Sequence, residues 1–144
     1  MQQIRFPQNE FQSFEAPMRA EVDIRGLEVV QGKVPEHLDG GFYRLLGDRQ
    51  WPSFIENDIF LLNEDGMASC LRISNGRVDF RTRYVKTPRF VAEEQAGRAL
   101  FGAYRNPLTD DPSVQGVRRG TANVTMLSFR AAELPAVRKM MSAA

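Results

Sequence analysis

The chain has one cysteine and one histidine among its 144 residues, and each scarcity argues against a class of site. Cys70 has no partner for an internal disulfide, which suits a reducing compartment such as the cytoplasm. It lies in an alternating apolar segment, so we expect a buried structural thiol and not a nucleophile. A metal centre needs several converging ligands. We therefore expect His37, alone in a turn-rich stretch, to be a surface residue.

The chain also lacks a dominant charge and a long apolar run. Nineteen basic and eighteen acidic residues leave a net charge of +1, which gives no field to draw it to nucleic acid or to an anionic membrane. Apolar runs such as 59–62 fall far short of the ~20 residues that span a bilayer. The N-terminus shows no secretory signal pattern. We expect one cytoplasmic globular domain with no nucleic-acid partner and no transmembrane segment.

What is present is a series of short β patterns separated by turns. Residues 1–20 show no clear period and predict an irregular N-terminal arm. Residues 27–32 are rich in β-branched side chains and end in a glycine, which predicts a strand and a turn. A turn-rich connector with Asp39-Gly40 follows, and residues 41–46 predict a second strand.

The clearest local pattern is a hairpin around Asn75-Gly76, because both residues of such a two-residue loop need positive φ. After the turn, polarity alternates with a period of two, which indicates a half-buried antiparallel strand. One face would carry Val78, Phe80, Thr82 and Tyr84, and the other Arg77, Asp79, Arg81 and Arg83. The basic row could bind an anion, but such a row is more often solvated, and that is our expectation.

One short helix is predicted near residues 88–96. Thr87 is a good N-cap, Pro88 suits the first turn, and Gly97 marks a stop. Prolines break the following chain into loops up to residue 116. The acidic pairs 64–65 and 110–111 could act as general acid and base, but each lies beside glycine or proline, where aspartate favours turns. The fold class is therefore mainly β with one helix.

Three segments resemble a known family. Residues 35–44 read Pro-x-x-Leu-x-Gly-x-Phe-x-Arg, residues 63–67 read NEDGM, and the long loop stretch 96–123 includes FGAYRNP and ends in Thr-Ala-Asn. Together they are similar to the N-terminal part of the carotenoid cleavage oxygenases, most closely of their lignostilbene dioxygenase branch. The stretch 96–123 is the most specific, because long runs of loop residues rarely agree by chance.

The resemblance implies a seven-bladed β-propeller in which four histidines hold Fe(II). At ~40–50 residues per blade, this chain would supply about one to two blades of an unclosed ring. In the lignostilbene branch, the central double bond of a 4-hydroxystilbene is cleaved with dioxygen to aromatic aldehydes. With a single histidine the chain lacks the iron ligands, so we expect it to bind no iron by itself and leave open whether it is an enzyme. An isoprenoid, carotenoid-type substrate is the alternative within the family.

The resemblance also implies site residues. Tyr104 matches the tyrosine that contacts the substrate phenol; the structural alternative is a buried tyrosine bonded to a loop carbonyl. Arg138 would stand where the family has lysine, and unlike lysine it stays protonated. Phe60 matches only poorly the aromatic residue of the substrate cleft.

The expected organisation is an arm at 1–20, a family-like portion at 21–123 and a divergent end at 124–144, which a frameshift or early stop would explain. An unclosed propeller would leave strand edges open to self-association. The alternative from another class is a small all-β interaction module without catalysis.

Overall fold

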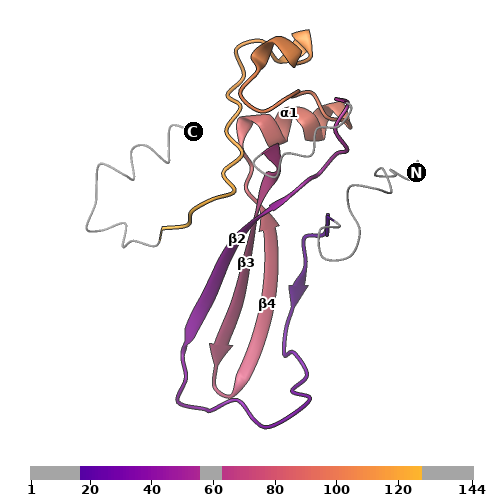
Figure 1. Ribbon diagram of the computed structural model, residues 1–144. Helices are drawn as coiled ribbons and strands as arrows, with labels where there is room; N and C mark the ends of the chain where they lie inside the picture. The colour runs from indigo at the N-terminus through magenta and orange to yellow at the C-terminus, as the bar shows by residue number, and fades with distance from the viewer. Residues whose placement is uncertain (1–16, 56–62, 128–144) are drawn as a thin grey trace.

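The computed structural model describes residues 17–55 and 63–127. Their centre is one antiparallel sheet with strand order β1-β4-β3-β2, in which β2, β3 and β4 are long and β1 is short (Figure 1). The strands are β1 (Asp23–Ile24), β2 (Gly40–Asp48), β3 (Asp65–Ser74) and β4 (Arg77–Tyr84). Helix α1 (Pro88–Ala96) and the 3-10 turns η3 (Pro107–Thr109) and η4 (Pro112–Val114) follow. The mainly β class with one short helix is confirmed.

The hairpin is confirmed. Asn75 and Gly76 connect β3 to β4 with φ of 50° and 70°, as a two-residue turn requires. On β4 the predicted alternation is clearest in its C-terminal half, where Thr82 and Tyr84 are buried while Arg81 and Arg83 are exposed. The basic row is solvated, and two of its members approach Asp23 of β1 at 3.0 and 3.5 Å.

The predicted strand at 27–32 is wrong. Strand β1 ends at Ile24, before this segment begins, and Gly26 then turns the chain with a φ of 67°. Val30 is 93% exposed, so the β-branched side chains here have no sheet to pack on, and their propensity alone does not make a strand. The second predicted strand is confirmed in the longer β2. Cys70 is partly exposed, not buried, because it lies on the sheet face that also carries Arg81.

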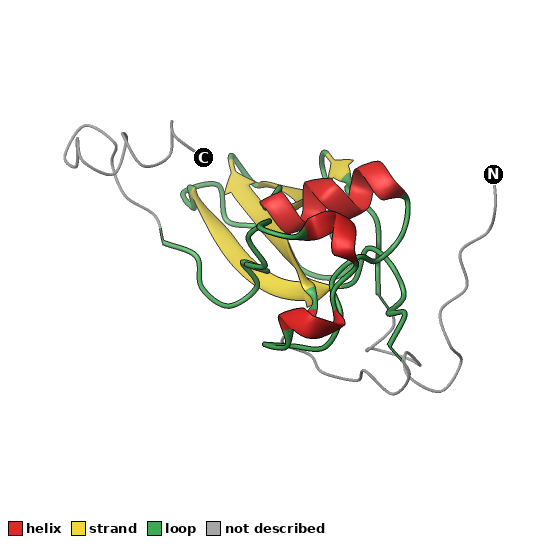
Figure 2. Ribbon diagram, turned by 90° about the horizontal axis from the view of Figure 1, so that it is seen from above, coloured by secondary structure: helices red, strands yellow, loops and turns green. Residues whose placement is uncertain are grey.

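Helix α1 forms as its end signals predict. The Thr87 hydroxyl accepts from the Phe90 N–H at 3.1 Å, and Gly97 closes the helix with a φ of 67°. The helix lies at the end of the sheet where β3 begins and β4 ends (Figure 1), and in the view from above it lies in front of the sheet (Figure 2). There Phe90 packs on Met67 and Tyr84, with 4.8 Å between the Tyr84 and Phe90 ring centroids.

Beyond the helix a second apolar cluster holds the loops together. Leu100, Phe101 and Val114 are buried against one another, with Ala92 of α1 beside them. Together with α1 this cluster places η3 and η4 at the same end of the sheet (Figure 1). No helix within 17–55 and 63–127 is long and apolar enough to cross a bilayer.

Candidate functional site

Tyr104 lies on a tight turn just after the second apolar cluster. The Asn106 N–H donates to the Ala103 carbonyl at 3.0 Å, and Arg105 between them has a left-handed φ of 59°. The Tyr104 side chain is partly exposed, at 36%, and the Arg105 guanidinium lies 5.3 Å from its ring centroid. Among the described residues the ring is therefore partly exposed and not buried.

The turn is reached through a close backbone approach at Gly102. A Cβ at this position would lie 2.3 Å from both the carbonyl and the hydroxyl oxygen of Thr109, so only glycine fits without a shift. The Thr109 hydroxyl in turn accepts from the Ala103 N–H at 2.8 Å. The glycine of the FGAYRNP stretch thus brings the Tyr104 turn against η3.

Side chains bind the backbone that leads into this turn. Glu93 Oε1 accepts from the N–H groups of Leu100 and Phe101, at 2.8 and 3.1 Å. The next residue, Gly102, donates to Asp110 Oδ1 at 2.9 Å and accepts from Asn63 Nδ2 at 2.9 Å. Side-chain groups thus satisfy the backbone of this irregular segment, which is part of no strand.

Arg119 completes the support from the C-terminal side. Its Nη2 donates to the Ala103 carbonyl at 2.9 Å and lies 2.9 Å from Asp110 Oδ1. Asp110 thereby receives both an arginine and a backbone N–H. Its neighbour Asp111 caps η4, and the side-chain hydrogen bond from Ser113 holds the pKa of Asp111 well below its usual range. The expected turn role is confirmed for Asp111, whereas the carboxylate of Asp110 binds groups eight and nine residues away in the sequence.

The other acidic pair does not behave as predicted, because Asp65 is buried at the start of β3. Arg89 of α1 lies 3.7 Å from Asp65 and 3.4 Å from Glu93, and donates to Asn63 Oδ1 at 2.6 Å. Burial raises the pKa of Asp65 from 3.8 to about 6; Arg89 opposes this and Glu93 adds to it. The group ties β3, α1 and the Tyr104 segment together.

Tyr84 is a less suitable candidate for contact with substrate. Its hydroxyl donates to Asp48 Oδ1 at 2.5 Å, and Asp48 also accepts from the N–H groups of Met18 and Arg19. Burial, reinforced by this hydrogen bond, raises the pKa of Tyr84 well above its ordinary value. Tyr84 is thus a neutral, engaged core residue, whereas Tyr104 faces outward.

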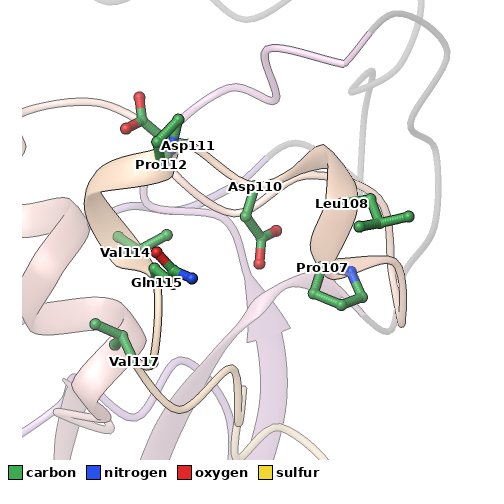
Figure 3. A pocket seen from close by; sticks show the side chains of 9 residues that line it. Pro107, Leu108, Asp110, Asp111, Pro112, Val114, Gln115 and Val117 are labelled. Carbon is green, nitrogen blue, oxygen red and sulfur yellow. The ribbon is translucent and has the colours of Figure 1, made fainter.

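A cavity of about 360 Å³ lies between η3 and η4 (Figure 3). Its lining includes Leu108, Val114 and Val117 as well as the carboxylates of Asp110 and Asp111. Both carboxylates already have partners, and Tyr104 is not among the lining residues. The cavity therefore belongs to the packing of the two turns and is separate from the tyrosine.

The described residues do not fit an iron centre. Among 17–55 and 63–127, no three histidine, cysteine, aspartate or glutamate side chains gather as metal ligands. His37, the single histidine of the sequence, is exposed in the connection between β1 and β2. Phe60 and Arg138, the other two predicted site residues, lie outside the described ranges. Of the predicted site, only the position of Tyr104 is described.

Comparison with known proteins decides the family. The model of the RPE65 family, described as retinal pigment epithelial membrane protein, matches residues 15–137. The chain belongs to this family. The RPE65 proteins are the carotenoid oxygenases indicated by the sequence, and the relatives of this chain include proteins named for the cleavage of lignostilbene and of resveratrol.

Two curated relatives and one solved structure illustrate this. Lignostilbene-alpha,beta-dioxygenase isozyme III of Sphingomonas paucimobilis is 52% identical over 111 residues, 77% of this chain and 22% of that protein. Resveratrol cleavage oxygenase 1 of Chaetomium globosum is 46% identical over 127 residues, which are 88% of this chain and 21% of that protein. The lignostilbene dioxygenase structure from Pseudomonas brassicacearum matches with a TM-score of 0.72 and 36% identity, over 84% of this chain and 25% of that one. The chain thus spans about a fifth of the length of these curated relatives.

Proposed function

We propose that the chain is the N-terminal part of an iron-dependent dioxygenase that cleaves the central double bond of 4-hydroxystilbenes to aromatic aldehydes. The observation that carries this is Tyr104: it stands in the family-like FGAYRNP stretch, on a turn that side chains fix, with its ring exposed. The names of the two curated relatives, one acting on lignostilbene and one on resveratrol, support a stilbene over a carotenoid substrate.

The chemistry assigned to Tyr104 is that of a hydrogen-bond donor. A neutral phenol O–H donates to the oxygen of the substrate phenolate, and a hydrogen bond to a charged group contributes about 1.5–3 kcal/mol. The substrate phenol then loses its proton more readily, and the phenolate pushes electron density into the double bond. Arg138 would add positive charge where the family has lysine, but as a guanidinium it would not exchange a proton.

The iron of the family supplies oxygen activation when it is bound, and this chain does not provide its ligands. A site of four imidazoles needs three more histidines than the sequence has. In this proposal the 144 residues supply substrate recognition, and the metal-binding residues belong to a longer protein. We therefore expect the chain alone to have no oxygenase activity.

The sheet would be one blade of the family's seven-bladed ring, and 144 residues would supply about one to two blades. In the described part of the chain β2 pairs with β3 alone, and Phe42 and Tyr43 of β2 are each 58% exposed. A nine-residue strand with an open edge and exposed aromatic rings is prone to pair with another chain. We expect concentration-dependent self-association of the isolated chain in the cytoplasm, where its lone cysteine stays reduced.

A chimera tests the assignment. Residues 1–123 would replace the matching N-terminal part of the Sphingomonas paucimobilis enzyme, and aldehyde formation from a 4-hydroxystilbene would be followed together with oxygen uptake. We expect activity from the chimera and a loss of about 10–100-fold in kcat/KM for Tyr104→Phe, the equivalent of the missing hydrogen bond. The matched control is Tyr43→Phe, an exposed tyrosine on β2.

Two outcomes would contradict the proposal. Equal activity of the Tyr104→Phe and Tyr43→Phe chimeras would show that Tyr104 does not contact the phenol. Turnover of a carotenoid in place of the stilbene would assign the chain to the other substrate class of the family. The second candidate function, an interaction module that uses the open β2 edge, predicts sharp cooperative melting of a monomeric chain, whereas broad melting with aggregation supports the proposed function.

A further inference from the structure

The segment that carries Tyr104 has an unusual form of support. Every backbone N–H from Leu100 to Ala103 donates to a side chain: two to Glu93, one to Asp110 and one to Thr109. In a helix, or in a strand paired with a neighbour, backbone carbonyls would accept from these groups. Here the path of the chain depends on the identity of a few side chains, so a substitution far from the phenol ring can move it.

Glu93 is the central member of this support. It is only 1% exposed, and one of its oxygens binds the N–H groups of Leu100 and Phe101. The other oxygen lies 3.4 Å from Arg89 Nε. Arg89 also binds Asn63, which donates to the Gly102 carbonyl, so the carboxylate acts on the segment by two routes.

Arg119 holds the end nearest the tyrosine. It donates to the Ala103 carbonyl, which directly precedes Tyr104, and the same nitrogen contacts Asp110. The Glu93 and Arg119 contacts come from opposite sides in the sequence, one from α1 and one from the loop after η4. Residues 100–103 are thus bound by side chains from both sides.

We propose that Glu93 and Arg119 are positioning residues, which set where the Tyr104 hydroxyl meets the substrate phenol. The inference rests on the proposed function of Tyr104 and extends it to residues that do not touch substrate. A displacement of about 1 Å at a reacting group can lower a rate about 100-fold, so the support matters even though it lies behind the site.

The first experiment uses the full 144-residue chain, at a concentration low enough to limit the expected self-association, with amide hydrogen exchange and NMR of tyrosine rings labelled with 13C. In Glu93→Gln, one acceptor oxygen becomes an NH₂ donor, which must face either the Leu100 and Phe101 N–H groups or Arg89 Nε, and these groups are all donors. We expect the Leu100 and Phe101 amides to exchange at least about tenfold faster and the Tyr104 ring signal to shift, while the Tyr43 signal stays. Glu94→Gln is the control, because Glu94 is exposed and its carboxylate pairs with Lys86 at the surface. Unchanged exchange and an unmoved Tyr104 signal in Glu93→Gln would overturn the inference.

Arg119→Gln provides an independent test, which decides the matter if Glu93→Gln does not fold. It removes the contacts to the Ala103 carbonyl and to Asp110, and its control is Arg118→Gln, since Arg118 is exposed. We expect the Tyr104 ring signal to shift in Arg119→Gln and not in Arg118→Gln. Identical spectra for the two variants would contradict the positioning role.

Kinetics in the chimera separate this inference from the proposed function. We expect Glu93→Gln and Arg119→Gln to lower kcat by about tenfold or more with a smaller change in KM, and to have no further effect once Tyr104→Phe is present. If Tyr104→Phe costs activity but the positioning variants do not, or if their effects multiply with it, the inference is wrong while the proposed function stands. If Tyr104→Phe costs nothing, the proposed function itself fails.

Discussion

The buried carboxylate of Asp65 gives the chain an inverted dependence of stability on pH. Most carboxylates in folded proteins have lowered pKa values, so stability rises as they ionise. Burial raises the pKa of Asp65 to about 6, so the folded chain holds the proton more tightly than the unfolded chain does. The stabilisation from this group is therefore complete below the unfolded value of 3.8 and is lost as the pH rises through about 6.

The size of the effect follows from the two pKa values. A difference between about 6 and 3.8, at about 1.4 kcal/mol per pKa unit, corresponds to about 3 kcal/mol. This is a large fraction of the free energy of unfolding of an ordinary domain, which is about 5–15 kcal/mol. Asn at position 65 resembles the protonated acid in shape and is neutral at every pH. We thus expect Asp65→Asn to be more stable than the unsubstituted chain at pH 7 by up to about 3 kcal/mol.

Urea titrations at low protein concentration, followed by circular dichroism, would measure this between pH 4.5 and pH 7. The unsubstituted chain should lose stability as the pH rises, and Asp65→Asn should lose much less. The control is Asp39→Asn, an aspartate whose side chain is 72% exposed, which should follow the unsubstituted chain. Parallel curves for Asp65→Asn and the unsubstituted chain, or a gain in stability towards pH 7, would refute the reasoning.

Two further substitutions test the packing around the site. Phe90→Ala removes the ring that joins α1 to the sheet, so the free energy of unfolding should fall by about 3–5 kcal/mol in the same titration. Its control is Phe54→Ala, at a 48% exposed position, which should cost much less. Equal losses would show that Phe90 is not a core residue. Gly102→Ala places a Cβ 2.3 Å from Thr109 oxygens, so the Tyr104 turn must move and the chimera should lose at least about tenfold in kcat/KM. Gly120→Ala meets nothing within 4 Å and serves as its control; similar rates for the two variants would contradict the close approach.

The elements that could be predicted from the sequence are those with local causes. The hairpin follows from Asn75-Gly76 and the period of two beside it, and α1 follows from Thr87 and Gly97 at its two ends. The strand expected at 27–32 failed because a strand needs a neighbour, and the chain leaves the sheet after Leu27, whose N–H donates to the Val78 carbonyl of β4. Local propensity does not report where the next strand lies.

The support around Tyr104 could not be predicted in this way. Asn63, Arg89 and Glu93 are polar residues, for which exposure is the default, and their contacts to residues 100–102 depend on how α1 packs on the sheet. One signal was present: Glu93 follows Phe90 by three residues and Arg89 by four, so all three share the buried face of α1. Tyr104 itself was found by resemblance alone, since a single exposed tyrosine has no pattern of its own.

The measurement that tests the central claim most directly is iron content and stilbene cleavage by the purified 144-residue chain, beside the chimera. With Fe(II) and dioxygen supplied, we predict that the chain retains no stoichiometric iron and yields no aldehyde from a 4-hydroxystilbene. The chimera should retain iron and form the aldehyde. Aldehyde formation by the chain alone, with dioxygen consumed, would contradict the division between substrate recognition here and metal binding elsewhere.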